Sequence, residues 1–255
     1  MIPLLEVNDI SFSYHTLEGE TPALSHISFS LMPGEFLAIV GPSGCGKSTI
    51  LNLLSGLLQP EHGEILMNQK PLSETKSQIG YMFQKDQLLE WRTIYKNVIL
   101  GLEIKKELKK EKLDFIEQLL HTYGLDKFKN AYPSQLSGGM RQRAALIRTL
   151  ALKPDLLLLD EPFSALDSQT RLSVSDDIGK ILKKEKKPAI LVTHDISEAI
   201  SMADRILIFT KRPATIQQEY PIQLSIPERT PFLSRNAPEF KAYFNDIWKE
   251  LNENA

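Results

Sequence analysis

The residues best suited to chemistry lie in a glycine-rich stretch between an apolar run and a helix-forming run. This stretch reads Gly41-Pro42-Ser43-Gly44-Cys45-Gly46-Lys47-Ser48-Thr49 and fits the pattern G-x-x-x-x-G-K-[ST]. Its glycines allow the backbone N–H groups to point inward at the positive end of a helix dipole, where a polyphosphate can lie. Lys47 can reach the β- and γ-phosphates, and the Ser48 hydroxyl can bind Mg²⁺. A chance glycine-rich turn rarely combines this full spacing with a strand before it and a helix after it.

Two adjacent carboxylates follow a second apolar run. Four leucines at 156–159 lead directly to Asp160 and Glu161, and neighbouring residues of a strand point to opposite sides. Asp160 can therefore hold the Mg²⁺ shell beside Ser48, while Glu161 accepts a hydrogen bond from an attacking water. A surface turn would explain one such acid but explains the pair poorly.

Two further polar side chains follow expected strands. The apolar run 189–193 ends at His194, at the end of a parallel sheet where ligands bind. Lone histidines are usually structural, but this position favours function. Gln84 follows a short strand over 79–83, and its amide can hydrogen-bond a metal-bound water and a neighbouring loop at once.

Two more segments leave alternatives open. Ser137 is placed as the N-cap of a helix that opens with Gly138 and Gly139. The paired glycines suggest that an anionic group approaches the exposed N–H groups, but a plain cap with a tight turn is an equal explanation. Tyr14 ends the first strand, where its ring could stack on a purine or pack as a strand-end aromatic.

The elements that must position these residues are expected from the apolar patterns. An amphipathic segment lies within 93–132, and we interpret it as a helical insertion whose charges at 105–112 form a solvated face. The last amphipathic run, 240–251, predicts a closing helix that packs on its own domain. We expect an edge-type antiparallel strand at 4–14, further strands at 24–31, 36–40, 63–67, 79–83, 156–159, 189–193, 205–209 and 215–224, and a helix from 47 to about 57.

Composition limits the function classes. Thirty Lys and Arg against 32 Asp and Glu give a net charge of −2, so we expect no nucleic-acid partner. Cys45 is the single cysteine, and we expect it to be a small filler in a protein from a reducing compartment. The sequence has no signal-peptide pattern and no apolar run near the roughly 20 residues that span a bilayer. A membrane role would therefore need a partner.

Together these residues resemble the ATP-binding subunits of ABC transporters. The phosphate loop, Gln84, the Leu-Ser-Gly-Gly run at 136–139, Asp160-Glu161, the run 164–167 and His194 follow the family's order over residues 4–212. The resemblance implies an α/β fold with a P-loop ATPase core, an antiparallel β edge subdomain and an inserted α-helical signature subdomain at about 85–155. It implies one ABC ATPase domain over 1–255, with a C-terminal extension at about 213–255, that hydrolyses ATP with Mg²⁺.

The resemblance also implies roles for single residues. Tyr14 would stack the adenine, and Gln84 would sense the metal and the γ-phosphate. Asp167 would communicate across a dimer, and His194 would contact the γ-phosphate and hold Glu161, which orients the water. A final group would bind the γ-phosphate of the nucleotide held by the opposite subunit: Ser137, Gly138 and Gly139. At 148–150 the family often has alanine-arginine-alanine where this chain has Arg148-Thr149-Leu150, a departure for which we expect no effect on chemistry.

The run 83–93 and the tail from 203 to 240 look like the importer branch that handles nitrate, sulfonates, taurine or pyrimidine thiamine precursors. That branch often has proline where Glu90 stands. In that branch Trp91 is a candidate for permease docking, and the alternative is a core tryptophan.

The resemblance implies a head-to-tail pair of copies, a transmembrane permease and, indirectly, an extracytoplasmic substrate-binding protein. The chain would then lie peripherally on the cytoplasmic face of the membrane. The alternatives are an ABC exporter ATPase and a soluble ABC ATPase that acts on DNA or ribosomes.

Overall fold

Two β-sheets form the centre of the computed structural model, which describes residues 2–17, 19–75, 78–185, 187–226 and 229–253. The larger sheet has the order β10-β9-β3-β8-β7-β6 and is parallel except for the antiparallel pair β9 and β10. Its strands are β3 (Phe36–Val40), β6 (Ile79–Met82), β7 (Leu156–Asp160), β8 (Ala189–Thr193), β9 (Arg205–Phe209) and β10 (Ile216–Pro221). An α/β core is the fold class that the sequence predicts.

The smaller sheet is antiparallel and has the order β2-β1-β4-β5. Its strands are β1 (Leu5–Thr16), β2 (Gly19–Leu31), β4 (His62–Met67) and β5 (Lys70–Pro71). The expectation that the first strand lies at an edge is wrong, because β4 pairs with β1 on the side away from β2. The alternating pattern of β1 is the same for an edge strand and for an inner strand with one buried face, so the pattern could not distinguish them.

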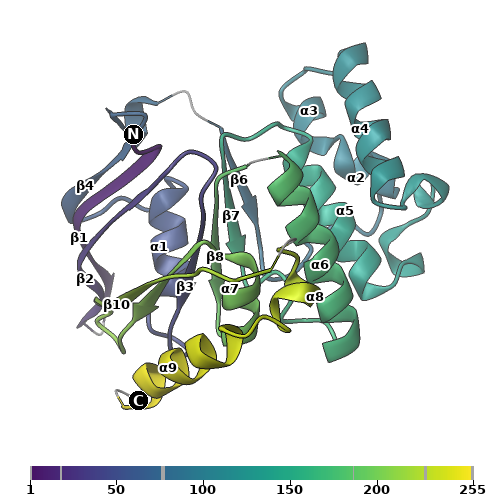
Figure 1. Ribbon diagram of the computed structural model, residues 1–255. Helices are drawn as coiled ribbons and strands as arrows, with labels where there is room; N and C mark the ends of the chain where they lie inside the picture. The colour runs from purple at the N-terminus through teal and green to yellow at the C-terminus, as the bar shows by residue number, and fades with distance from the viewer. Residues whose placement is uncertain (1, 18, 76–77, 186, 227–228, 254–255) are drawn as a thin grey trace.

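The helices surround the larger sheet, and α1 (Lys47–Leu54) lies between the two sheets (Figure 1). The expected helix end near residue 57 is three residues too late, because the chain turns at Gly56 with a φ of 76°. The other helices are α2 (Ile94–Val98), α3 (Leu100–Ile104), α4 (Lys110–Thr122), α5 (Gly138–Leu150), α6 (Ser168–Glu185), α7 (Ile196–Met202), α8 (Pro231–Ser234) and α9 (Phe240–Glu253). Short 3₁₀ turns lie at Leu72–Glu74, Asp126–Phe128 and Pro133–Gln135.

The parallel strands are apolar throughout because both of their faces are buried. Alternate residues of β3 belong to two different hydrophobic clusters, with Ala38 and Val40 in one and Leu37 and Ile39 in the other. One cluster includes α1 and the antiparallel sheet, and the other includes residues of α2 to α7 and α9. Burial on both faces is what a continuous apolar strand requires.

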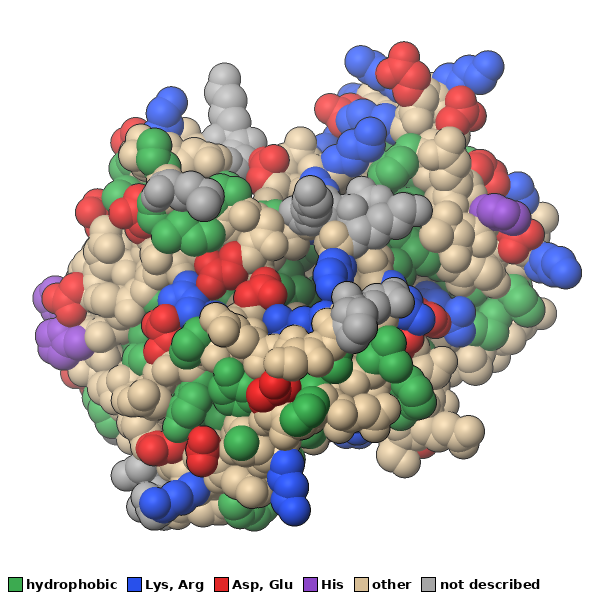
Figure 2. Space-filling model, viewed as in Figure 1, with side chains coloured by type: hydrophobic (Ala, Val, Ile, Leu, Met, Phe, Trp, Pro, Cys, Tyr) green, Lys and Arg blue, Asp and Glu red, His purple; other side chains and the backbone are tan. Residues whose placement is uncertain are grey.

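Helices α2 to α5 gather at one side of the molecule (Figure 1). Over this side, Figure 2 shows basic and acidic side chains interspersed on the surface, as expected for a solvated face. Lys129 and Glu117 form one ion pair there at 3.1 Å. No helix in the described part of the chain is long and apolar enough to cross a bilayer.

The chain after residue 213 packs against the core. Strand β10 pairs with β9 in the larger sheet. On α9, Ile247 is fully buried in the core cluster, whereas Trp248 beside it is 56% exposed. The closing helix therefore packs on its own chain, as its amphipathic pattern predicts.

Candidate nucleotide-binding site

The polar residues that follow three parallel strands meet at one end of the larger sheet. In register, Val40 of β3 lies opposite Thr193 of β8, and Asp160 of β7 lies opposite Val192. The phosphate loop directly follows β3, His194 directly follows β8, and the carboxylate pair lies at the end of β7, so the topology places them together. This end of an open parallel sheet is where ligands bind.

The phosphate loop folds tightly between β3 and α1. Gly44 and Gly46 have φ values of 75° and 121°, in the region that favours glycine. The Lys47 ammonium donates to the carbonyl oxygens of Gly41 at 2.7 Å and Pro42 at 2.9 Å. The loop therefore holds its lysine over its own backbone, at the start of a helix whose N–H groups can bind an anion.

Cys45 is a packed residue of this loop, with 2% of its surface exposed. A Cβ added at Gly41 would lie 3.0 Å from the Cys45 sulfur, so the thiol fills the space beneath the loop. Burial raises the pKa of this thiol, which keeps it protonated and unreactive. The expected filler role agrees with this geometry.

Ser48 and Asp160 form a pair of oxygen ligands. The Ser48 hydroxyl donates to Oδ1 of Asp160 at 3.1 Å, and the Tyr81 hydroxyl donates to Oδ2 at 3.2 Å. Burial raises the pKa of Asp160, while these two hydrogen bonds lower it. Among the described residues, no group of three His, Cys, Asp or Glu side chains could hold a metal ion. One hydroxyl and one carboxylate suit Mg²⁺, which usually completes its shell with waters and substrate phosphates.

Glu161 lies between the two other residues that the sequence selects for the reaction. Its Oε2 atom is 3.2 Å from Nε2 of Gln84 and 3.2 Å from Nδ1 of His194. Its backbone φ is 43°, a strained value for a residue with a side chain. Gln84 also donates to the Ser164 hydroxyl at 3.2 Å. Gln84 and His194, which are far apart in the sequence, thus meet at the carboxylate of Glu161.

A cavity of about 340 Å³ opens at this place. Tyr14 contacts the phosphate loop from β1, because its hydroxyl lies 3.0 Å from Oγ1 of Thr49. Tyr14 is 37% exposed, and its ring packs edge-on against Phe12. The cavity is lined by Ser43, Gly44, Gly46, Lys47, Ser48, Thr49, Gln84, Glu161 and Arg212.

Ser137, Gly138 and Gly139, here called the signature residues, are not among the residues that line this cavity. Ser137 caps α5, because its hydroxyl accepts from the Met140 N–H at 3.4 Å, which confirms the predicted N-cap. A Cβ at Gly139 would lie 2.9 Å from Val174 of α6, so close packing also requires this glycine. Asp167 caps α6, since its Oδ1 accepts from the Thr170 N–H at 3.0 Å, a bond that lowers the pKa of Asp167.

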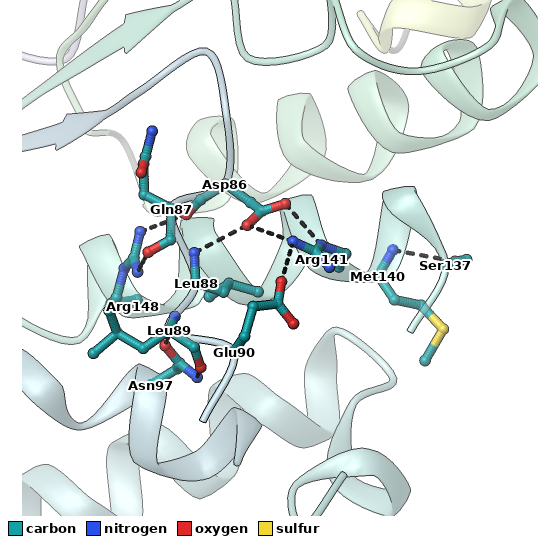
Figure 3. A network of polar contacts seen from close by, with 10 residues as sticks. All are labelled: Asp86, Gln87, Leu88, Leu89, Glu90, Asn97, Ser137, Met140, Arg141 and Arg148. Carbon is teal, nitrogen blue, oxygen red and sulfur yellow. Dashed lines mark hydrogen bonds and ion pairs between the residues drawn. The ribbon is translucent and has the colours of Figure 1, made fainter. Parts of the chain in front are cut away.

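A network that the sequence did not reveal joins the segment after Gln84 to the signature helix (Figure 3). Arg141 of α5 donates to Asp86 at 2.8 Å and to Glu90 at 2.9 Å. Arg148, about two turns further along α5, donates to the backbone oxygens of Asp86 and Gln87, each at 2.6 Å. The departure at 148 therefore has a structural role close to Gln84. In the sequence, this contact was indicated only by Arg148 itself, a charged residue near the mostly apolar end of α5.

Trp91 is 76% exposed, so the alternative of a core tryptophan is wrong. It follows Glu90 directly, and Glu90 is the residue that pairs with Arg141. An exposed large aromatic side chain thus lies next to the network that leads to the signature helix.

Comparisons with known proteins show the family to which the chain belongs. Residues 24–164 match the family model described as ABC transporter. The chain is 45% identical to the uncharacterized ABC transporter ATP-binding protein YtlC of Bacillus subtilis, covering 97% of this chain and 95% of YtlC. It is 37% identical to the aliphatic sulfonates import ATP-binding protein SsuB of Bacillus licheniformis, with 97% and 93% covered. It is also 37% identical to the nitrate import ATP-binding protein NrtD of a Synechocystis species, with 95% and 93% covered.

One solved structure shows the same fold with bound products. The ATP-binding cassette MJ0796, in a dimeric post-hydrolysis state with ADP and Pi, has a TM-score of 0.74 and 30% identity, with 86% of this chain and 99% of that chain covered. The family model, the relatives and the solved structure all indicate the same family. The chain therefore belongs to the ATP-binding subunits of ABC transporters, a family of ATP hydrolases.

Proposed function

We propose that this protein powers an ABC importer for a small solute such as nitrate, a sulfonate, taurine or a pyrimidine. The observation that carries the ATPase part is the position of Glu161, held by Gln84 and His194 at the cavity that Lys47 and Ser48 line. The importer part draws support from relatives named for sulfonate and nitrate import.

In this proposal the polyphosphate of ATP lies in the loop from Gly41 to Thr49. Lys47 exchanges its contacts with backbone oxygens for contacts with the β- and γ-phosphates, and Tyr14 stacks on the adenine. The Ser48 hydroxyl and the Asp160 carboxylate would hold Mg²⁺, with Gln84 reaching it through a bound water. When bound, Mg²⁺ neutralises charge on the phosphates.

Hydrolysis then depends mainly on how the protein positions the attacking water and stabilises charge at the γ-phosphate. Glu161 accepts a hydrogen bond from the attacking water and places it in line with the γ-phosphoryl group. His194 holds Glu161 and donates to the γ-phosphate as charge develops there. The rate enhancement comes from positioning and from electrostatic stabilisation by Lys47, His194, bound Mg²⁺ and the N–H groups of the opposite copy's signature residues, with little covalent chemistry.

We further propose that two copies act as a head-to-tail pair. Ser137, Gly138 and Gly139 do not line the cavity of their own chain, which fits residues that bind the γ-phosphate held by the opposite copy. Asp167 would carry the signal across the pair. Each site is then incomplete without the partner, and closure of the pair on ATP is the motion that a permease can use.

The proposed permease docks beside Trp91, on the cytoplasmic face of the membrane, and a substrate-binding protein acts on the permease from the other side. The rivals are an exporter ATPase and a soluble ABC ATPase. A soluble mechanical ABC protein usually has a long coiled coil between the two halves of its motif set, whereas this chain has a short helical insertion there. Likeness to the import proteins favours an importer over an exporter.

The test is co-purification of the tagged chain from its native membranes in mild detergent, with ATPase activity measured before and after. We expect a hydrophobic permease that stimulates hydrolysis, and the solute of its binding protein then identifies the substrate. Recovery only with ribosomes or DNA would overturn the transport proposal. A permease that moves its solute outward would contradict the importer hypothesis and support the exporter hypothesis.

A further inference from the structure

The turn between β9 and β10 is built against the phosphate loop. Thr210 and Thr215 close the base of this turn, because the Thr210 N–H donates to the Thr215 carbonyl at 3.0 Å and their hydroxyls lie 3.1 Å apart. Ala214 then joins the turn to β2 by two backbone hydrogen bonds of 2.9 Å, with Ala23 and Ser25. These contacts give the turn a defined position.

The same segments pack directly on the glycines of the phosphate loop. A Cβ at Gly46 would lie 2.9 Å from the Leu24 side chain and 3.1 Å from the Ala23 carbonyl. A Cβ at Gly41 would lie 3.0 Å from Phe209, the last residue of β9. The phosphate loop is therefore closely packed against the end of β9, which leads into the turn, and against the part of β2 to which the turn is hydrogen-bonded.

Arg212 is the side chain that this turn presents to the loop. Its Nη2 atom donates to the Gly44 carbonyl at 2.8 Å, and the residue lines the same cavity as Lys47 and Ser48. A guanidinium has five N–H donors, and among the described residues the Gly44 carbonyl is the one hydrogen-bond acceptor found for Arg212. The residue with these remaining donors lines the cavity in which we propose that the polyphosphate lies.

We propose that Arg212 is a further nucleotide-binding residue, whose guanidinium donates to the phosphate oxygens of the nucleotide. This inference rests on the proposed function of the cavity. Arginine suits the task because its planar donors match phosphate oxygens in pairs, and such charge-assisted bonds are the strong ones. The contact is to phosphate rather than to the base, because Arg212 lies over Gly44 whereas the purine candidate, Tyr14, reaches the loop at Thr49.

Binding of ATP and of ADP with Mg²⁺ to the purified full chain, by titration calorimetry at low and high salt, tests the inference. We expect Arg212→Gln to raise the Kd for both nucleotides about tenfold at low salt and less at high salt, because salt screens the exposed charge that the variant removes. Arg212→Lys keeps the charge but not the paired donors, so its Kd should lie between those of the wild type and Arg212→Gln. Lys211→Gln is the matched control. It removes the same charge from the adjacent exposed residue and should change the Kd less than twofold.

Cys45 reports whether Arg212 acts instead by holding the loop. Cys45 is the single cysteine and is 2% exposed. The rate at which it reacts with a thiol reagent therefore measures how often the phosphate loop opens in protein without nucleotide. An unchanged rate in Arg212→Gln together with weaker binding supports direct contact. A faster rate in that variant, or a Kd equal to that of the wild type, overturns it. Failure of the wild-type chain to bind ATP would instead refute the function proposed for the cavity.

Discussion

The Nδ1 atom of His194 lies 3.2 Å from the Oε2 atom of Glu161. Gln84 approaches the same oxygen, so one carboxylate oxygen is held from two sides. For the other oxygen, Oε1, the described residues show no hydrogen bond. That oxygen can therefore accept from a water, which is the role proposed for Glu161.

The first prediction concerns Glu161→Gln. An amide keeps the size of the side chain but cannot take up a proton, so we expect ATP binding to stay within about twofold while kcat falls at least about 100-fold. Nucleotide titration and steady-state phosphate release measure the two effects. Glu64→Gln makes the same chemical change on an exposed strand residue and should leave both values unchanged. Normal turnover by Glu161→Gln would remove Glu161 from the mechanism.

The second prediction concerns Arg148→Ala. The guanidinium bonds to the carbonyls of Asp86 and Gln87, and its loss leaves two acceptors without a charged donor. We expect the free energy of unfolding to fall by about 2–4 kcal/mol and hydrolysis to weaken, because the segment beginning at Gln84 loses its attachment to α5. Urea unfolding and ATPase assays measure these changes. Arg235→Ala, at an exposed position, should change stability by less than about 0.5 kcal/mol, and equal effects of the two variants would contradict the assigned contact.

The third prediction concerns the pH dependence of stability. Burial raises the pKa of Glu198 from 4.5 to about 8, and its buried Oε1 atom has no hydrogen-bond partner among the residues that the structure describes. The folded protein then holds a proton that the unfolded chain releases above about pH 4.5. Its contribution to the free energy of unfolding is therefore present below that pH and falls by about 1.4 kcal/mol per pH unit up to about pH 8.

The groups around Glu198 act in both directions on its pKa. Thr193 donates to it at 2.6 Å and Arg171 also lowers the pKa, while Asp195 and Glu161 raise it. Glu198→Gln removes the titration but keeps the shape, so the stability of the wild type relative to this variant should decrease as pH rises from 5 to 8. Parallel pH profiles in urea unfolding would mean that Glu198 is ionised in the folded protein.

The fourth prediction tests how the closing helix packs. Ile247 is fully buried while Trp248 is 56% exposed. We expect Ile247→Ala to lower the free energy of unfolding by about 2–5 kcal/mol because it leaves a cavity in the core. Trp248→Ala should cost less than about 1 kcal/mol. Similar small effects of both variants in urea unfolding would show that α9 detaches before the rest of the chain unfolds.

The sequence by itself determined the features that depend on neighbouring residues. The phosphate loop follows from the spacing of Gly41, Gly44, Gly46 and Lys47, because backbone conformation there is a local property. Ser137 was predictable as a cap for the same reason. The strands buried on both faces were visible as uninterrupted apolar runs, and parallel pairing then placed Asp160 and His194 at one end of the sheet.

Only the tertiary structure decided the contacts between distant segments. Arg141 and Asp86 are 55 positions apart, and Arg212 and Gly44 are 168 apart. The inner position of β1 depends likewise on β4, which follows more than 40 residues after it. An arginine in a helix or a turn has the same local pattern whether it faces solvent or a distant carbonyl. The packing of the elements determines which distant group the arginine contacts, and the local sequence pattern holds no information about that packing.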